Sequence, residues 1–374
     1  MKKKKACDFT LMISILLLTF IGVIMVFSSS WPDGLDKMGN GYFYLKKQLV
    51  AAILGFGAMI FFMNFDYKNL YKLSRIIFAI AVVSGLLIIT PLGTTLGTTA
   101  KRWVNLGFTT FMPSDVIKLG SIIFFAAFLS KRKENIQDFK KGFIPSMIIV
   151  GFVCGLIIIQ KDLGTTATLA FTLVIMFFVS GAKIQHLSMV GVSGTIALAL
   201  AIIQPFADAG ERYRIKRVTT FLDPFKDIQG DGWQVVQSLY ALGSGGLFGL
   251  GLGKSRQKFF YIPEPYNDFI FAIIGEELGF LGCATVILLY ALVIWRGIKI
   301  ALNAKDFFGC ILATGITTLI TVQSLIHMAV VTSSMPTTGI PLPFISYGGT
   351  SLMTYMAIAG ILLNISRHTE LDRS

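Results

Sequence analysis

The amino-acid sequence predicts an all-α polytopic membrane protein, built as a single bundle of about ten transmembrane helices. Two observations predict this class. Hydrophobic residues make up 54% of the 374 residues and charged residues only 14%, with a mean hydropathy of +0.72, which excludes an ordinary soluble domain. Apolar stretches of near bilayer length also recur along the whole chain. Because a bilayer gathers many spans into one bundle, we interpret residues 1–374 as one domain.

The expected spans begin close to the N-terminus, where Lys2 to Lys5 precede an apolar run in the manner of a secretory signal. That run is about as long as a bilayer is thick and further spans follow, which favours an uncleaved first helix. The apolar runs cover residues 9–27, 49–65, 76–89, 116–129, 143–159, 165–180, 187–206, 269–295, 307–331 and 344–363.

Basic loops indicate the orientation of these spans. Lys and Arg gather in residues 68–75, 131–141 and 296–305, and again in the C-terminal tail. Under the positive-inside rule these loops and both termini lie in the cytoplasm. The large segment 207–267, between the seventh and eighth helices, then forms an extracytoplasmic loop.

The net charge of +13 has an explanation that involves no nucleic acid. In a chain of this hydropathy, cytoplasmic loops and contacts with anionic headgroups or phosphates account for the excess of base. The four cysteines are scattered and show neither a disulfide framework nor zinc-ligand spacing. We expect them to be packing residues.

The outer loop contains an amphipathic stretch and a series of glycines. Trp233, Val236 and Tyr240 are spaced on one helical face, which favours a helix on the membrane surface; a plain linker is the alternative. The glycines between positions 243 and 253 suggest a dinucleotide fingerprint, but no strand or Rossmann unit surrounds them. We reject that interpretation.

The most informative stretch joins a polar, proline-marked segment to an apolar helix that begins at Phe269. Asn267 or Asp268 can cap this helix, and Asp268 then lies beside the outer membrane edge. A purely structural N-cap and a functional carboxylate are both compatible with that position. Glu276 and Glu277 follow inside the helix, where charge is costly. We expect both to be paired inside the bundle.

Other spans also carry polar side chains. Asp115 and Lys118 lie one helical turn apart, so they either pair with each other or serve a function. His327 lies one turn from Gln323. No second His or Cys stands at ligand spacing, which favours a satisfied polar bridge over a metal site.

The outer face limits the chemistry. No nucleotide is supplied there, so a synthetic reaction needs a substrate that is already activated, such as a lipid-linked sugar diphosphate. Basic residues can bind the diphosphate and stabilise the charge that develops as it leaves. One carboxylate then suffices as the base that deprotonates an acceptor hydroxyl. A transporter would instead have broken helices and charges at the bilayer midplane.

Several motifs carry a resemblance that covers nearly the whole chain. They are KRWVNLG from Lys101, PSDVIKL from Pro113, DLGTT from Asp162, YRIKRVTTFLDPF from Tyr213, WQVVQSLYALGSGGLFGLGLGKSRQKFFYIPEPYNDFIFAIIGEELGFLG from Trp233 and TGIPLPFISYGGTSL from Thr338. The chain resembles the shape, elongation, division and sporulation (SEDS) family of peptidoglycan glycosyltransferases, the group of RodA, FtsW and SpoVE.

The resemblance implies a ten-helix protein of the cytoplasmic membrane that polymerises lipid II on the outer face, together with a class B penicillin-binding protein that supplies the transpeptidase. It implies that Asp268 is the catalytic residue. It also implies substrate-binding roles for Arg102, Lys118, Asp162, Arg214, Arg217, Lys258 and Glu264.

Three hypotheses follow. The first is an inverting glycosyltransferase in which Asp268 is the general base. The second is a lipid II flippase, and the third is a non-catalytic scaffold of the division, elongation or sporulation complex. No cofactor or metal site is evident, and the sequence does not decide whether a divalent cation assists the diphosphate.

Overall fold

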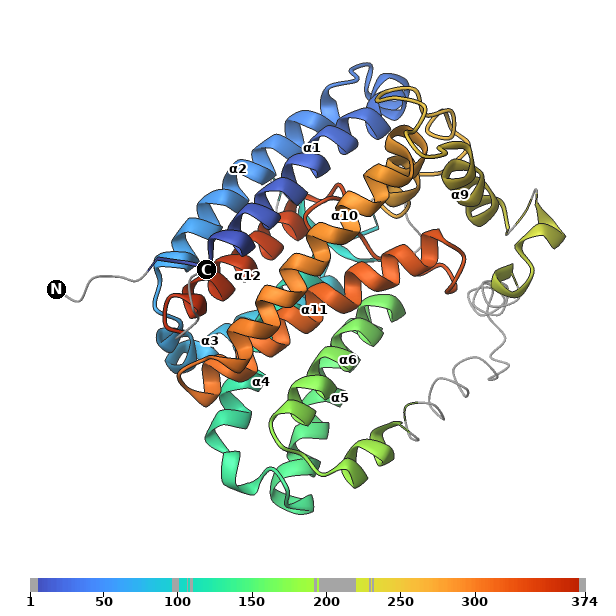
Figure 1. Cartoon of the computed structure of the whole chain (residues 1–374). Coiled ribbons are helices and arrows are strands. Elements are labelled where there is room, and N and C mark those ends of the chain that lie inside the picture. The colour runs from blue at the N-terminus through green and yellow to red at the C-terminus, as the bar shows by residue number, and fades with distance from the viewer. Residues whose placement is uncertain are drawn as a thin grey trace.

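The computed structural model of the protein describes residues 6–95, 101–105, 107, 110–191, 194, 220–228, 230 and 232–369. Most of these residues are helical, and long helices lie side by side in one elongated bundle (Figure 1). The helices are α1 (Phe9–Met38), α2 (Phe43–Asn64), α3 (Tyr67–Leu86), α4 (Pro113–Lys131), α5 (Ile144–Ile158), α6 (Leu163–Val179), α9 (Trp233–Ser244), α10 (Ile270–Leu302), α11 (Phe307–Val331) and α12 (Gly349–Ser366). The all-α membrane fold is thereby confirmed.

Eight helices of the described part are long and apolar enough to cross a membrane: α1, α2, α3, α4, α5, α10, α11 and α12. A ninth apolar helix, α6, has 17 residues. Each overlaps an expected span, but α3 and α10 are longer than predicted and include residues 68–75 and 296–302, which were expected to be basic loops. The seventh expected span, residues 187–206, lies mostly outside the described residues, as does much of the predicted outer loop.

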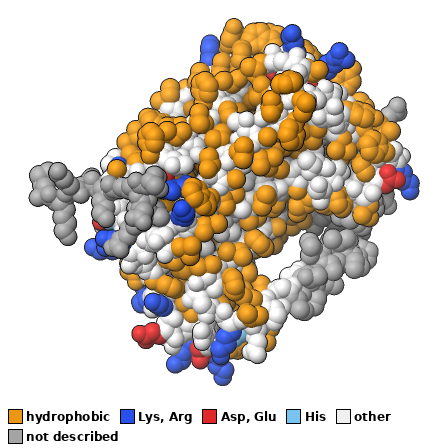
Figure 2. All heavy atoms as spheres, viewed as in Figure 1, with side chains coloured by type: hydrophobic (Ala, Val, Ile, Leu, Met, Phe, Trp, Pro, Cys, Tyr) orange, Lys and Arg blue, Asp and Glu red, His pale blue; other side chains and the backbone are white. Residues whose placement is uncertain are grey.

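The helices form an inner and an outer set. α2 packs along α12, α3 along α4, and α10 along both α1 and α11. α4, α11 and α12 are the most enclosed, whereas the most apolar stretches of α2, α3, α5 and α10 are mostly not buried. Figure 2 shows hydrophobic side chains over the middle of one face and charged side chains mainly near its margins. This distribution suits a lipid environment.

Two polar contacts of α1, at its start and ten residues before its end at Met38, are separated by about the thickness of a bilayer. At the end that bears the chain termini, Asp8 caps α1 by accepting from the Leu11 amide (2.9 Å) and pairs with Arg296 of α10 (2.6 Å). At the opposite end, Ser28 of α1 donates to Glu277 of α10 (2.7 Å). Twenty residues of helix separate Asp8 from Ser28, about 30 Å. That matches the hydrocarbon thickness of a bilayer.

Short elements close the end opposite the termini, here called the outer end. Strands β1 (Gly93–Thr94), β2 (Trp103–Asn105) and β3 (Thr110–Phe111) form an antiparallel sheet with Val104 paired to Gly93 and Phe111. A 3₁₀ turn at Leu87–Ile89 precedes β1, and another lies at Pro224–Asp227. At the opposite end, between α4 and α5, lie a 3₁₀ turn at Lys133–Asn135 and a π-helical turn at Phe139–Phe143.

The amphipathic stretch of the outer loop is helical, as predicted, and forms α9. The residues predicted to share one face differ in burial: Val236 is fully buried, whereas Tyr240 is 48% exposed. α9 packs on α10 and α11, and Ser238 donates to the Val331 carbonyl at the end of α11 (2.8 Å).

Candidate functional site

Asp268 lies in the last turn before α10, at the outer end, and is half-buried. The predicted helix cap is wrong. The N-cap residue is Phe269, whose side chain cannot accept a hydrogen bond, and its carbonyl accepts from the Ala272 amide (2.9 Å). Asn267 turns back and donates through its side chain to Glu264 (3.2 Å). Neither Asn267 nor Asp268 is therefore the N-cap residue of α10.

A non-helical segment, residues 338–348, runs beside Asp268. Its Ser346 donates to the Asn267 carbonyl (2.7 Å), and the Tyr347 amide donates to the Tyr266 carbonyl (2.9 Å). At Gly339 the backbone φ is +69°, and a Cβ there would lie 3.3 Å from Asp268 Oδ2. Glycine thus allows this backbone to lie close to the carboxylate.

Buried side chains from the helices hold the 338–348 segment in place. His327 Nδ1 donates to the Ile340 carbonyl (2.8 Å) and Gln323 donates to the Pro341 carbonyl (2.8 Å). Tyr290 of α10 donates to Pro343. Of the satisfied polar bridge predicted at His327, the Nδ1 contact is present, whereas Nε2 is buried with no hydrogen-bond partner among the described residues. The last span was expected to begin at position 344, but the Tyr347 amide donates to the Tyr266 carbonyl and the Gly348 amide to the Gln48 side chain, so α12 begins only at Gly349.

Three tyrosines, including Tyr266 two residues before Asp268, pack together. The rings of Tyr44, Tyr266 and Tyr347 contact one another with centroids 4.7 to 5.6 Å apart. Burial raises the pKa of Tyr347 to about 12. Burial and the neighbouring Tyr44 also raise the pKa of Tyr266, which donates to Asp33 (3.4 Å). The Tyr347 and Tyr266 phenols therefore stay protonated at physiological pH.

Arg102 and Asp162 meet where α6 begins. The Asp162 carboxylate caps α6 by accepting from the Thr165 amide (3.0 Å) and hydroxyl (2.9 Å). Arg102 donates to the Lys161 carbonyl (3.0 Å). A Cβ on Gly164 would lie 3.0 Å from the Ile340 side chain. The start of α6 therefore packs on the same segment that borders Asp268.

Lys118 and Asp115 form a buried ion pair (2.7 Å), so the predicted pairing is confirmed. Asp115 also lies 3.4 Å from the Thr350 hydroxyl, in the first turn of α12. The Lys118 ammonium lies 5.3 Å from the centroid of the Tyr355 ring. This pair thus adjoins the helix that follows the 338–348 segment.

The remaining predicted site residues have different surroundings. Glu264 is exposed, with a backbone φ of +45°. Lys258 is buried and pairs with Glu277 (2.9 Å). Arg214 and Arg217 lie outside the described residues. Among the described residues, no group of three or more His, Cys, Asp or Glu side chains could hold a metal ion.

Sequence reasoning missed a break in α10. Gly279 has φ +67° and ψ −163°, which interrupts the helix. The glycine-rich loop 245–251 fills the break: Leu250 and Gly251 donate to the Glu276 and Glu277 carbonyls (2.9 and 3.0 Å), and Phe280 donates to the Gly246 carbonyl (2.8 Å). The glycine series was the available signal. Its role is close backbone contact rather than nucleotide binding.

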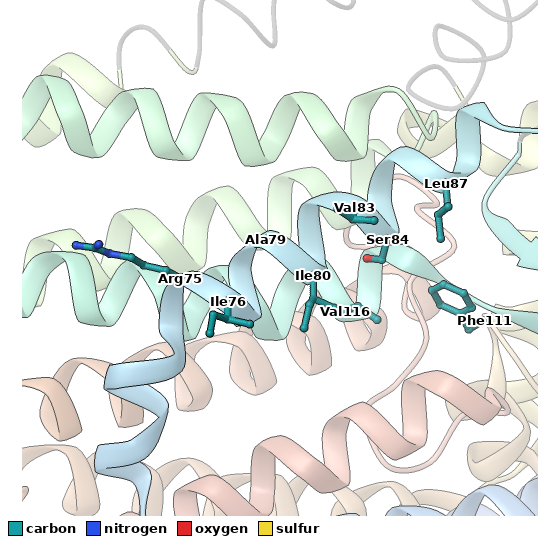
Figure 3. A pocket seen from close by; sticks show the side chains of 9 residues that line it. All are labelled: Arg75, Ile76, Ala79, Ile80, Val83, Ser84, Leu87, Phe111 and Val116. Atoms are coloured by element: carbon teal, nitrogen blue, oxygen red, sulfur yellow. The ribbon is translucent and has the colours of Figure 1, made fainter.

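A groove of about 660 Å³ runs along α3 (Figure 3). Apolar side chains line it between Arg75, toward the end with the termini, and Phe111 with Val116, toward the outer end. Ile76, Ile80 and Val83 are each more than half exposed. The groove can accommodate a long apolar chain and opens beside the first turn of α4.

The fold and this site define a multi-pass helical membrane protein with a half-buried carboxylate at one end of the bundle. The family model for the FtsW, RodA and SpoVE cell cycle proteins matches residues 9–371. The chain belongs to this family, as the motifs predicted.

Relatives and solved structures agree over nearly the full length. The chain is 44% identical to stage V sporulation protein E of Bacillus subtilis, covering 98% of this chain and 99% of that protein. It is 38% identical to a protein of Geobacter sp. (strain M18) named "Probable peptidoglycan glycosyltransferase FtsW", covering 98% of each. A chain from a solved peptidoglycan synthase complex, described as coordinating polymerization and crosslinking, superposes with a TM-score of 0.80 at 26% identity, covering 98% of this chain and 99% of that one. The crystal structure of Thermus thermophilus RodA shares the fold, with a TM-score of 0.71, 24% identity and coverage of 98% and 99%.

Proposed function

We propose that this chain is a peptidoglycan glycosyltransferase that polymerises lipid II into β-1,4 glycan strands at the outer face of the cytoplasmic membrane. The observation that carries the proposal is the Asp268 carboxylate, half-buried at the outer end and bordered by Gly339 of the 338–348 segment. Relatives that carry this enzymatic name over the same length support it.

In the proposed reaction Asp268 removes the proton from the GlcNAc 4-hydroxyl of the acceptor. The hydroxyl oxygen attacks the anomeric carbon of the donor MurNAc, the bond from that carbon to the diphosphate oxygen breaks, and undecaprenyl diphosphate leaves with inversion. A diphosphate is a good leaving group, so no strong general acid is needed. Cationic side chains stabilise its developing charge. Arg102, Lys118, Arg214 and Arg217 remain the proposed contacts, and the apolar groove along α3 offers a surface for a lipid tail.

Both termini are proposed to be cytoplasmic, because the basic loops lie at the end of the bundle that bears them. A class B penicillin-binding protein is the proposed partner, which agrees with the synthase complex whose chain superposes here. The proposed reaction needs no organic cofactor. Adding EDTA to the assay below tests whether a divalent cation assists the diphosphate.

A lipid II flippase is the second candidate, because α10 is broken at Gly279 and carries buried carboxylates beside the break. Transporters use broken helices at the bilayer midplane. Here the break contacts Ser28, about 30 Å along α1 from Asp8, and so lies at the membrane boundary. That position favours chemistry over translocation.

The test is a polymerisation assay with purified chain, its co-purifying transpeptidase partner and lipid II. We expect glycan polymer from the wild-type complex. Absence of polymer together with transfer of lipid II across liposome membranes would replace the proposal with the flippase. Absence of both activities would favour the third hypothesis, a non-catalytic scaffold.

A further inference from the structure

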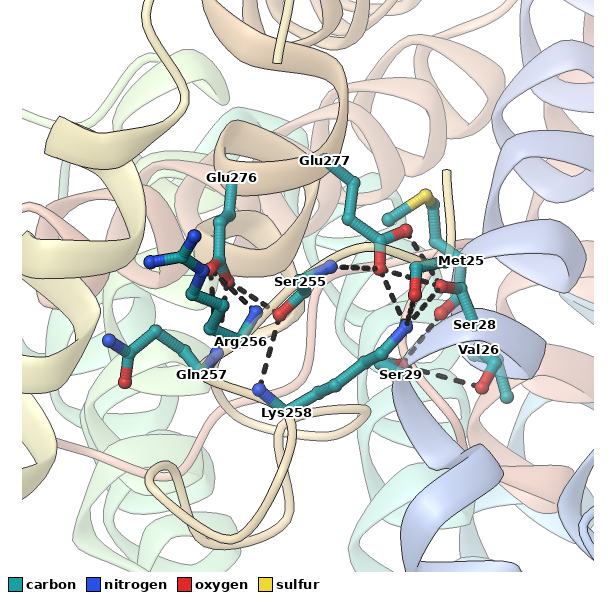
Figure 4. A network of polar contacts seen from close by, with 11 residues as sticks. Met25, Val26, Ser28, Ser29, Ser255, Arg256, Gln257, Lys258, Glu276 and Glu277 are labelled. Carbon is teal, nitrogen blue, oxygen red and sulfur yellow. Dashed lines mark hydrogen bonds and ion pairs between the residues drawn. The ribbon is translucent and has the colours of Figure 1, made fainter. Parts of the chain in front are cut away.

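A buried network at the break of α10 takes no part in the reaction proposed above (Figure 4). The Lys258 ammonium donates to Glu277 (2.9 Å), to the Gly253 carbonyl (2.7 Å) and to the Ser28 hydroxyl (3.2 Å). An ammonium group has three N–H donors. These contacts use all of them, inside a site where the Lys258 and Glu277 side chains are 4% and 0% exposed. Lys258 has no donor left for a diphosphate.

The neighbouring carboxylate, Glu276, organises the turn before Lys258. It accepts from the Ser255 hydroxyl (2.5 Å) and the Arg256 amide (2.8 Å). Ser255 in turn accepts from the Lys258 amide (3.1 Å), while its own amide donates to Glu277 (3.3 Å). The two carboxylates therefore fix the loop against α10 through both its backbone and its side chains.

The part of α10 before the break connects this network to Asp268. Residues 270–277 are all buried, and the short helix they form begins two residues after Asp268 and ends at Gly279. At the other end of this short helix, the 245–251 loop donates two backbone hydrogen bonds to the Glu276 and Glu277 carbonyls. A shift of this half-helix along its axis would displace Asp268 by the same amount.

We propose that Lys258, Glu276 and Glu277 are positioning residues, which lock the half-helix 270–278 between α1 and the 245–258 loop and thereby hold Asp268 in its reactive position. The inference rests on the proposed function and changes the role that the family resemblance implies for Lys258. Lys258 acts through Glu277 and not on the diphosphate.

A charge-pair rescue tests this. Lys258→Met leaves Glu277 buried without its cation, and we expect turnover of lipid II to fall about a hundredfold, with the apparent KM nearly unchanged. The double variant Lys258→Met/Glu277→Gln removes both charges. Its turnover should be at least about tenfold higher than that of Lys258→Met. If the double variant is as inactive as Lys258→Met, or if the loss appears in KM, Lys258 contacts the substrate and the proposal is wrong.

Hydrogen exchange provides a readout that does not depend on activity. In Lys258→Met the amides of Leu250, Gly251 and Phe280 should exchange faster than in the wild type, and the double variant should restore their protection. Unchanged exchange in Lys258→Met would overturn the positioning role. Wild-type protein that makes no polymer would refute the proposed function, while the exchange result would still decide whether the network locks the half-helix.

Discussion

Two buried ion pairs at the outer end illustrate how similar contacts can have different consequences. Asp115–Lys118 (2.7 Å) and Glu277–Lys258 (2.9 Å) have nearly the same length and burial. The first pair lies within one turn of α4, so it forms whenever that helix forms. The second joins a loop to α10 and shares the Ser28 hydroxyl of α1. Distance and burial do not distinguish the pairs; the elements they connect do.

The largest expected difference is in stability. Removing one partner of a buried pair leaves an uncompensated charge, which costs about 3–5 kcal/mol. We expect Glu277→Ala to lower the free energy of unfolding by this amount. Asp115→Ala should cost only about 1.5–3 kcal/mol, because Lys118 lies one turn from the start of α4 and can move toward the outer surface.

Denaturant titration of the two variants in the same detergent measures this contrast. Equal losses would mean that the contacts with α1 and the loop add nothing to the Glu277 pair. A larger loss for Asp115→Ala would reverse the comparison.

The glycine loop offers a second comparison with a matched control. Gly249 and Gly253 share a φ of +80°, but a Cβ on Gly249 would lie 2.2 Å from the Glu277 carbonyl oxygen, whereas a Cβ on Gly253 would meet nothing within 4 Å. Gly253→Ala should therefore cost only the left-handed backbone penalty, about 1–2 kcal/mol. Gly249→Ala should cost about 1–3 kcal/mol more, because the backbone must shift.

The same unfolding titration applies to both alanine variants. If Gly249→Ala were no worse than Gly253→Ala, the loop would not be held tightly against the break in α10. The comparison isolates steric contact because the backbone strain is common to both positions.

The smallest expected effect concerns Asp162, which caps α6 near the 338–348 segment. Asp162→Ala removes the cap and should cost about 1 kcal/mol, whereas Asp162→Asn keeps a capping oxygen and should cost much less. Thermal unfolding of both variants tests the cap. Apparent affinity for lipid II tests the substrate role separately: an unchanged value in Asp162→Asn would show that this carboxylate only caps.

Local patterns in the sequence predicted the fold and the local pair. Apolar runs of bilayer length identified the spans, and a spacing of three residues was enough for Asp115 and Lys118. The sequence did not predict the partner of Glu277, because Lys258 lies 19 residues away and Ser28 lies 249 residues away. Pairing that depends on tertiary structure leaves no periodic signal.

Two helix boundaries, the break in α10 and the start of α12, could not be predicted from local sequence patterns either. Gly279 stands in an apolar run that looks like an ordinary helix, and its break is stabilised only by the distant loop. The last span was predicted to begin at position 344, yet the Tyr347 and Gly348 amides donate to Tyr266 and Gln48 outside any helix. In both cases a partner far along the chain overrides the local preference for helix.

The most direct test of the account compares two carboxylate-to-amide changes in the lipid II polymerisation assay. Asp268→Asn should leave the complex assembled and lower the initial rate by at least about a hundredfold, because an amide cannot serve as the general base. Asp36→Asn, an exposed position at the far end of α1, should polymerise at the wild-type rate. Wild-type polymerisation by Asp268→Asn would contradict the assignment of Asp268 as the catalytic base.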